Sequence, residues 1–367
     1  MRKDWMINQS EADSLIIKIL QRKIDENLLV TGCAGSGKSV LALYKALRVQ
    51  NERRGEYSVI VYTKALCAFM QSGCDFLKLA KPVLYKDDWL YNKHIPTADY
   101  VIVDEIQDFT KDEVQAFMNN ARKHFFFFGD EAQSVYNGFP NGDGTKKQTV
   151  TMNDIRQMAE QKGGCAYFEL PRNYRLPKPV ARITQDYIGV NVPKFGDGLT
   201  YMSEETAKPK ILCYRSFPEQ LEAIIRIIKN RELDDVAILF KDNGLIPHVK
   251  ECLVAEDEKD VSMYHRRKLY FDAKYKGDSH FSPLTDLHFD RPENPKLLTF
   301  HSAKGLQFEN VFIPFLSDPT DEMWRKALYV AMTRTYRNLF LMYSGDEPSI
   351  LKEIPADLYE VSEIDKI

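Results

Sequence analysis

One segment near the start of the chain has the residue types and spacing that bind phosphate groups. Residues 32–39 read Gly-Cys-Ala-Gly-Ser-Gly-Lys-Ser and match the pattern G-x-x-x-x-G-K-[ST] at every fixed position. Glycines allow such a loop to curl so that its N–H groups face phosphate oxygens, and the N-terminus of a following helix adds partial positive charge. The residues that we expect to contact a nucleotide are Gly32, Gly35, Ser36, Gly37, Lys38 and Ser39.

The last two positions of this loop predict specific chemistry. We expect Lys38 to neutralise the β- and γ-phosphates of a nucleoside triphosphate and the Ser39 hydroxyl to coordinate Mg²⁺. A glycine-rich turn that binds no nucleotide is the alternative. The apolar run before the loop predicts a strand and residues 40–50 predict a helix, and this context argues against such a turn.

A pair of acidic residues forms the second chemical signal. Asp104 and Glu105 follow the apolar run Val101–Val103, so they lie at the carboxyl end of a predicted buried strand, where open α/β sheets bind ligands. We expect Asp104 to hold Mg²⁺, directly or through water, and Glu105 to take a proton from an attacking water. Acidic strand ends are common, but downstream of a phosphate loop this pair predicts the second half of a triphosphate-hydrolysing site.

The elements that must position these residues predict an α/β protein with parallel sheets, because short β-rich runs alternate with amphipathic helical stretches. Nearly continuous apolar runs predict buried strands. The run of four phenylalanines at 125–128 fits a central strand better than a stacking surface. The expected strands are 28–31, 58–63, 100–104 and 124–129 in the first half and 211–214, 236–240, 297–300, 311–314 and 339–343 in the second.

The length and composition favour two ordinary domains, and they exclude several classes of protein. The chain has 367 residues and a formal net charge of −3, so any nucleic-acid contact must come from a local groove. Six cysteines without a CxxC pair match neither a zinc nor an iron–sulfur site, which predicts free thiols in a reducing cytoplasm. Since no apolar stretch is long enough to span a bilayer, we expect a cytoplasmic protein with no membrane segment and no structural metal.

Further motifs resemble those of the UvrD/Rep-type superfamily 1A DNA helicases, and they follow the family's order from about residue 7 to about residue 343. Their agreement in order makes the resemblance specific. The matching segments are 9–12 (Q-x-x-A), 104–108 (D-E-x-Q-D), 129–136 (G-D-x-x-Q-S-I-Y), 170–175 (L-x-x-N-Y-R), 299–308 (T-x-H-x-x-K-G-L-E-F) and 327–334 (L-Y-V-A-M-T-R).

The resemblance implies two RecA-like P-loop NTPase domains, each a mainly parallel sheet flanked by helices, with ATP and Mg²⁺ as cofactors. We expect the first domain at 1–168 and the second at 169–367, with a short insertion near 257–294. The segment 257–294 is charged, aromatic and rich in turn residues, so we interpret it as a surface excursion.

The resemblance also implies roles for residues outside the phosphate loop. Gln9 would bind the adenine edge and Tyr174 would stack on its face, while Gln307 would bind a ribose hydroxyl. Gln133 would sense the γ-phosphate from the first domain.

Two arginines, Arg175 and Arg334, would reach the γ-phosphate from the second domain as arginine fingers. ATP would then be enclosed only when the two domains close, and alternate closing and opening would move the protein along a strand. The family works on DNA and moves in the 3′-to-5′ direction.

Five residues are candidates for nucleic-acid contacts. Thr63, Lys64 and His301 are expected to contact backbone phosphates, and Tyr136 to stack on a base. A packed tyrosine is an almost equal alternative for Tyr136. After Tyr136 the family continues x-W-R-G, whereas residues 137–140 read Asn-Gly-Phe-Pro, so Phe139 could replace the missing stacking residue only in part.

The chain is also shorter than the family, whose members carry large inserted domains that contact duplex DNA. Only residues 64–100 and 176–298 occupy the corresponding gaps. The main hypothesis is therefore an ATP-dependent translocase or helicase on single-stranded DNA. The alternative is an ATP-switched accessory subunit that regulates or loads a partner nuclease or other effector. A P-loop kinase is a weaker third hypothesis, because it leaves the paired arginines and the ordered motifs unexplained.

Overall fold

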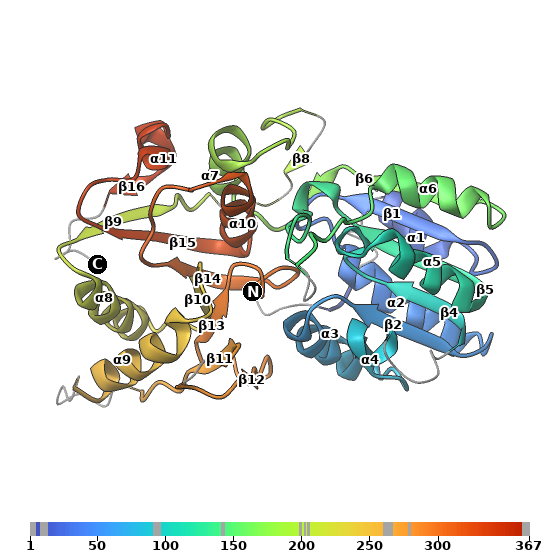
Figure 1. Cartoon of the computed structure of the whole chain (residues 1–367), viewed down its shortest axis with the longest axis horizontal. Coiled ribbons are helices and arrows are strands. Elements are labelled where there is room, and N and C mark those ends of the chain that lie inside the picture. Colours follow the sequence, from blue (N-terminus) through green and yellow to red (C-terminus); the bar gives the residue numbers. More distant parts are fainter. Residues whose placement is uncertain are drawn as a thin grey trace. The chain divides into compact units, whose positions relative to one another are not determined.

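The chain divides into two units, Met1–Tyr174 and Arg175–Ile367, and each is built around its own sheet (Figure 1). The computed structural model describes residues 5–7, 14–90, 97–140, 144–197, 200–201, 203, 206–259, 267–277 and 280–361. The division falls past the expected boundary at residue 168, because the last strand of the first sheet continues to Leu170 and the segment after it contacts the phosphate loop.

The first unit holds six parallel strands in the order β3-β2-β4-β5-β1-β6. The strands are β1 (Leu28–Gly32), β2 (Tyr57–Val61), β3 (Val83–Tyr85), β4 (Ala98–Val103), β5 (Ala121–Gly129) and β6 (Ala166–Leu170). The apolar runs identified in the sequence form β1, β2, β4 and β5, so those predictions are confirmed. The four phenylalanines are buried in β5, between β4 and β1.

Helices cover both faces of this sheet (Figure 1), as parallel strands with apolar side chains on both faces require. One face carries a cluster in which apolar residues of α5 and α6 pack against alternate residues of β4 and β5. The helices are α1 (Ser14–Gln21), α2 (Lys38–Asn51), α3 (Lys64–Leu77), α4 (Lys86–Leu90), α5 (Lys111–Asn120) and α6 (Met152–Glu160). The two-residue strand β7 (Arg172–Asn173) closes the unit.

The second unit holds eight strands in the order β12-β11-β13-β10-β14-β15-β9-β16, and only β11 and β12 pair antiparallel. The strands are β9 (Lys210–Tyr214), β10 (Val236–Phe240), β11 (Asp272–Tyr275), β12 (Leu284–Asp286), β13 (Lys296–Thr299), β14 (Phe308–Ile313), β15 (Thr335–Ser344) and β16 (Glu360–Val361). The fold class is therefore confirmed as α/β, with two units that each have a mainly parallel sheet.

Helices also flank the second sheet (Figure 1). At the start of α8 (Phe217–Asn230), Ser216 caps the N-terminus by accepting a hydrogen bond from the Glu219 N–H group. The remaining elements are β8 (Thr200–Tyr201), α7 (Lys178–Ile183), a π-helical turn (Thr184–Ile188), α8 (Phe217–Asn230), α9 (Leu245–Lys259), α10 (Glu322–Met332) and α11 (Ser349–Lys352).

The segment 257–294 is not only a surface excursion, and this corrects the sequence interpretation. Within it, β11 pairs in parallel with β13, and β12 forms the edge of the second sheet. Leu269, Phe271 and Ala273 are buried, whereas Tyr270 is exposed. The four residues of β11 include Asp272 and Lys274, and these charges obscured the strand in the sequence.

Candidate nucleotide site and strand-contacting residues

The phosphate-loop segment connects β1 to α2 at the carboxyl edge of the first sheet. Gly35 and Gly37 have φ angles of 78° and 90°, in the left-handed region that residues with side chains rarely adopt. A Cβ atom on Gly32 would lie 2.7 Å from Ser36 Oγ and 2.8 Å from Leu170 Cβ. The loop thus needs glycine for backbone conformation at positions 35 and 37, and for space at position 32.

Lys38 begins α2, and its side chain turns back into the loop. The residue is buried, and its ammonium group donates hydrogen bonds to the carbonyl oxygens of Gly32 at 2.8 Å and Cys33 at 2.9 Å. The Ser36 hydroxyl donates to the same Cys33 carbonyl at 2.8 Å. A buried cation therefore lies beside the N-terminus of a 14-residue helix, which is an arrangement suited to a polyphosphate.

The segment after β6 supports this loop from the side. The Asn173 side-chain amide donates to the Ala34 carbonyl, and the Tyr174 N–H group donates to the Gly35 carbonyl at 3.1 Å. Asn173 is buried, whereas Tyr174 is 36% exposed. Asn173 was not predicted as a site residue, although it lies in the L-x-x-N-Y-R segment at 170–175.

Asp104 follows β4 and is fully buried. Burial, and secondarily the neighbouring Glu105 carboxylate, raise the pKa of Asp104 to about 7, while the Ser39 hydroxyl and the Lys38 ammonium partly oppose this shift. Asp104 Oδ1 accepts a hydrogen bond from the Glu105 N–H group at 3.0 Å. The structure thus brings Lys38, Ser39 and Asp104 together, in the combination that the sequence suggested.

The chemistry around Asp104 fits a magnesium ion. Its Oδ2 atom is buried, and no group among the described residues donates a hydrogen bond to it. Such an oxygen is costly to bury unless a cation or a donor compensates it. Mg²⁺ prefers carboxylate, hydroxyl and phosphate oxygens, and Ser39 supplies a hydroxyl on the same side. These two residues would therefore hold the ion.

Glu105 begins a buried hydrogen-bonded run of polar side chains. Its backbone lies in the left-handed region with φ 56°, which is rare for a residue with a side chain. Its Oε2 atom accepts a hydrogen bond from Gln107 Nε2, and Gln107 Oε1 accepts one from the Asp130 N–H group at 2.9 Å. Asp130 Oδ2 in turn accepts from Gln133 Nε2. The expected base and the expected γ-phosphate sensor are therefore linked through Gln107 and Asp130.

The remaining expected ATP contacts lie in the second unit. The Arg175 guanidinium donates to Gln307 Oε1 at 3.3 Å and to the Thr333 carbonyl at 3.0 Å. Arg334 is 2% exposed, and its guanidinium donates to the Val330 and Leu306 carbonyls and to Thr333 Oγ1. Both arginines thus donate to Thr333, Gln307 accepts from Arg175, and the Arg334 guanidinium bonds within its own unit. Gln9 lies outside the described residues.

The five candidates for nucleic-acid contact have different environments. The Thr63 hydroxyl caps α3 by accepting from the Leu66 N–H group at 3.0 Å, whereas Lys64 is exposed. Tyr136 is half-buried, and its ring centroid lies 5.6 Å from that of Phe139. In the second unit, burial, and secondarily the Lys304 cation, lower the pKa of His301 to about 4, so this imidazole is neutral at physiological pH.

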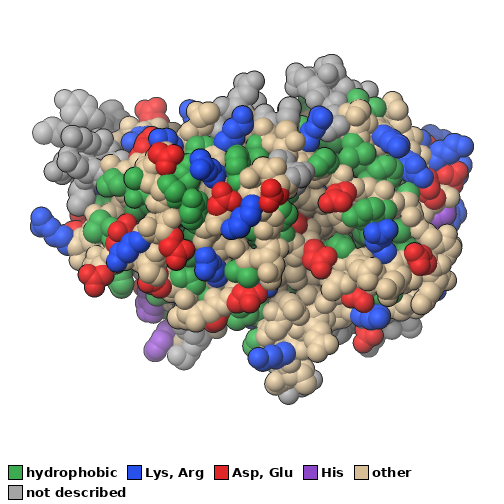
Figure 2. Space-filling view, turned by 90° about the horizontal axis from the view of Figure 1, so that it is seen from above, with side chains coloured by type: hydrophobic (Ala, Val, Ile, Leu, Met, Phe, Trp, Pro, Cys, Tyr) green, Lys and Arg blue, Asp and Glu red, His purple; other side chains and the backbone are tan. Residues whose placement is uncertain are grey.

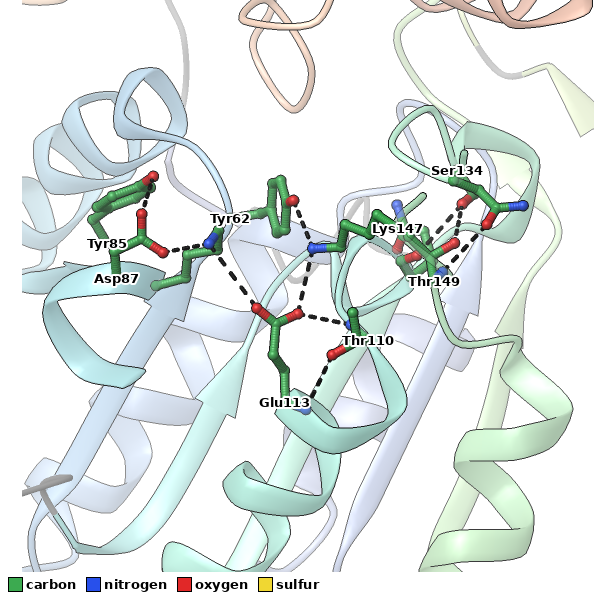
Figure 3. Close-up of polar contacts among 11 residues, drawn as sticks. Tyr62, Tyr85, Asp87, Thr110, Glu113, Ser134, Lys147 and Thr149 are labelled. Carbon is green, nitrogen blue, oxygen red and sulfur yellow. Dashed lines mark hydrogen bonds and ion pairs between the residues drawn. The ribbon is translucent and has the colours of Figure 1, made fainter. Parts of the chain in front are cut away.

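Tyr136 also belongs to a polar and aromatic cluster that the sequence did not predict. Its ring lies 4.5 Å from that of Tyr62. The Tyr62 hydroxyl lies 2.7 Å from Lys147 Nζ (Figure 3). Lys147 is buried and forms an ion pair of 3.4 Å with Glu113, which completes a capping box with Thr110 at the start of α5. These contacts favour the packed interpretation of Tyr136. They also join the loop after Gln133 to β2 and α5.

The charged surface is mixed rather than basic. On the face drawn in Figure 2, lysine and arginine side chains alternate with aspartate and glutamate among the described residues. This agrees with the net charge of −3. Contact with a phosphate backbone would therefore depend on a few local groups.

No helix in the described part of the chain has both the length and the apolar character that spanning a bilayer requires. The described ranges also contain no group of three or more His, Cys, Asp or Glu side chains arranged to hold a metal ion. A magnesium ion at Asp104 would accordingly take most of its ligands from phosphate and water, as is usual for this ion.

Two family models match parts of the chain. The model described as the viral superfamily 1 RNA helicase core domain matches residues 28–156, and the one described as the UvrD-like helicase C-terminal domain matches residues 296–342. A curated relative, a probable DNA helicase of Mycoplasma pneumoniae, is 26% identical over 269 residues. The matched region is 66% of this chain, and the chain spans 43% of the relative's length.

Similar solved structures include Bacteroides Pif1 bound to single-stranded DNA, with a TM-score of 0.48, 14% identity and coverage of 96% of this chain and 95% of that one. The C-terminal domain of a possible DNA helicase from a Lactobacillus has a TM-score of 0.36 and 17% identity, and the match covers 52% of this chain and 99% of that domain. The two sequence models are the more informative matches, because the segments that they cover contain the phosphate loop, the acidic pair and Arg334.

Proposed function

The chain belongs to the superfamily 1 helicases, and we propose that it hydrolyses ATP in the first unit and uses the energy to move along single-stranded DNA. The observation that carries the proposal is the convergence of Lys38, Ser39 and Asp104 at the carboxyl edge of one parallel sheet, with Glu105 directly beside Asp104. A phosphate loop alone would support nucleotide binding. The buried acidic pair next to it supports hydrolysis.

The roles of the first-unit residues follow from their chemistry. Lys38 binds the β- and γ-phosphates, and Ser39 with Asp104 holds Mg²⁺, which when bound neutralises charge on the phosphate oxygens. Glu105 takes a proton from the attacking water. Gln133 orients this water or senses the γ-phosphate, and Tyr174 offers an exposed ring to the adenine.

The second unit supplies the arginines in this proposal. Arg175 and Arg334 stabilise the charge that develops on the γ-phosphate, a contribution of about 10³–10⁵ in rate where such residues have been measured. Arg334 must first exchange its internal acceptors, the Val330 and Leu306 carbonyls, for phosphate oxygens. Turnover therefore depends on both units, and this dependence couples hydrolysis to movement.

The polymer and the direction are the finer parts of the proposal. The motif resemblance implies DNA and 3′-to-5′ movement. The Mycoplasma relative is named a probable DNA helicase, whereas one matching model describes an RNA helicase core, so both polymers belong in the test.

A second candidate function is an ATP-switched accessory subunit that regulates or loads a partner nuclease or effector. Two observations favour it: the Trp-Arg pair expected after Tyr136 is absent, and the face in Figure 2 has mixed charge. Such a subunit would hydrolyse ATP and respond to a partner, but it would displace little duplex unaided.

Strand displacement distinguishes the two functions. The substrates are fluorescent duplexes that carry a 3′ or a 5′ single-stranded tail, made of DNA or RNA, and the Lys38→Ala variant is the blank. The proposal expects ATP-dependent displacement on 3′-tailed DNA by the purified chain. ATP turnover without displacement on any substrate would favour the accessory subunit, and displacement only on RNA would overturn the choice of polymer.

A further inference from the structure

One residue of the acidic segment has a geometry that the proposed mechanism does not yet use. Gln107 is fully buried in the 3-10 turn Ile106–Asp108, two residues after Glu105. Its side-chain amide makes one hydrogen bond at each end. The nitrogen donates to Glu105 Oε2, and the oxygen accepts from the Asp130 N–H group at 2.9 Å.

The partners of Gln107 fix which way its amide points. The Asp130 N–H group can only donate, so it must face the amide oxygen. The amide nitrogen must then face the Glu105 carboxylate, which can accept. Reversal of the amide would lose both hydrogen bonds, and in a buried site each unpaired group would carry a desolvation cost. Gln107 is therefore held in one orientation.

Packing holds the amide in place as well. Gly129 ends β5, and a Cβ atom there would lie 2.7 Å from Gln107 Oε1 and 2.8 Å from Ile106 Cγ2. The backbone of the Gly129–Asp130 turn thus closes directly over the amide. The same turn continues to Gln133, whose amide nitrogen donates to Asp130 Oδ2.

We infer that Gln107 is a positioning residue for ATP hydrolysis, which holds the Glu105 carboxylate and the Gln133-bearing turn in fixed relation to one another. The inference rests on the proposed function, because it assumes that Glu105 activates the water. Both ends of the Gln107 side-chain amide are bonded within the protein. It acts through Glu105 on one side and through Asp130 on the other.

The residue type agrees with this role. Glutamate at position 107 would keep the size and the acceptor, but it would oppose a second carboxylate to Glu105. Methionine would keep the approximate shape and lose both hydrogen bonds. Neither change touches the phosphate loop, so nucleotide binding should be nearly unaffected while the chemical step slows.

The test compares Gln107→Met and Gln107→Glu with the wild type. The matched control is Gln115→Met on α5, where the Gln115 amide donates an exposed hydrogen bond to the neighbouring Asn119. ATP turnover, affinity for a fluorescent ADP analogue and melting temperature are measured for each. We expect kcat to fall about 10–100-fold in both Gln107 variants, since general-base catalysis contributes about 10²–10⁴-fold. The affinity for the analogue should stay within about threefold, and Gln115→Met should behave as the wild type.

A double-mutant cycle separates positioning from general support of the fold. In a Glu105→Gln background, the base is already lost, so Gln107→Met should reduce the residual single-turnover rate by less than about threefold. A full additional loss in that background, or a normal kcat in both single variants, would overturn the inference.

The failures of the two proposals are distinguishable. If the wild type hydrolyses ATP and the Gln107 variants do so equally well, only the positioning role is wrong. If the wild type shows no turnover with any strand, the proposed function fails and the positioning role fails with it. If Gln107→Met does not fold, Gln107→Glu carries the same test, because it preserves the volume and the acceptor.

Discussion

Replacement of Gly32 by alanine is the sharpest test of how the phosphate loop is built. The added Cβ atom would lie 2.7 Å from Ser36 Oγ, 2.8 Å from Leu170 Cβ and 3.0 Å from the Leu170 carbonyl oxygen. None of these atoms can move easily. Ser36 is bonded to the Cys33 carbonyl, and Leu170 is paired with Gly32 in the sheet.

The expected cost follows from these distances. Carbon atoms in ordinary contact lie at least 3.4 Å apart, so the loop and β6 must separate by about 0.6 Å. Overpacking of this kind typically costs about 1–3 kcal/mol of stability. Because the moving atoms belong to the loop that is proposed to bind phosphate, we expect nucleotide affinity to fall about tenfold or more, which corresponds to about 1.4 kcal/mol.

The assay is titration with a fluorescent ADP analogue, combined with thermal unfolding. The matched control is Gly244→Ala, because Gly244 in the second unit is exposed and a Cβ atom there meets nothing within 4 Å. We expect the control to bind and melt as the wild type. Wild-type affinity together with wild-type melting in Gly32→Ala would show that the loop is not packed as described.

Three further predictions concern charged and titratable groups. Lys147→Met should lower the stability of the first unit by about 1–3 kcal/mol in thermal unfolding, because it breaks the buried ion pair with Glu113. Lys146 is exposed, so Lys146→Met should change this stability by less than about 0.5 kcal/mol. Mg²⁺ binds the ionised form of a carboxylate, and the pKa of Asp104 is raised to about 7. Titration calorimetry should therefore show a magnesium affinity that rises with pH up to about 7 and then levels off. The Asp104→Asn substitution should abolish this pH dependence. The pKa of His301 is lowered to about 4, so its NMR signals should show no titration between about pH 5 and about pH 8. The contribution of His301 to the free energy of unfolding should decrease as pH falls from about 6.5 towards 4, because in this range the unfolded chain binds a proton and the folded chain does not.

The parts of the fold that the sequence predicted are those with a local signal. Continuous apolar runs predict buried parallel strands, and the phenylalanine run at 125–128 is buried in β5 as expected. The phosphate loop was equally clear, because each of its fixed positions has a separate physical reason. Both signals are contained within about ten residues, so no knowledge of tertiary contacts was needed.

Features that depend on contacts distant in sequence were not predicted. The strand β11 was missed because its four residues include an aspartate and a lysine and because its neighbours are charged. The contact between Lys147 and Tyr62 joins residues that are 85 positions apart, and neither residue type indicates the other. The support of the Ala34 carbonyl by Asn173 spans 139 positions.

The environment of Arg334 shows another limit of sequence patterns. The motif predicted an arginine that reaches phosphate, whereas the guanidinium donates to groups of its own unit. A motif indicates which residue type the reaction needs, but it does not indicate which acceptors that side chain binds when it does not contact phosphate. The phosphate-contacting role of Arg334 therefore stays a prediction.

ATP turnover by the purified chain, with and without single-stranded DNA, tests the central claim most directly. The measurement includes single-stranded RNA as a second polymer and the Lys38→Ala variant as the blank. We expect turnover that single-stranded DNA stimulates strongly and that Lys38→Ala lacks. Turnover that persists in Lys38→Ala, or no turnover with either polymer, would contradict the account of a strand-coupled ATP hydrolase.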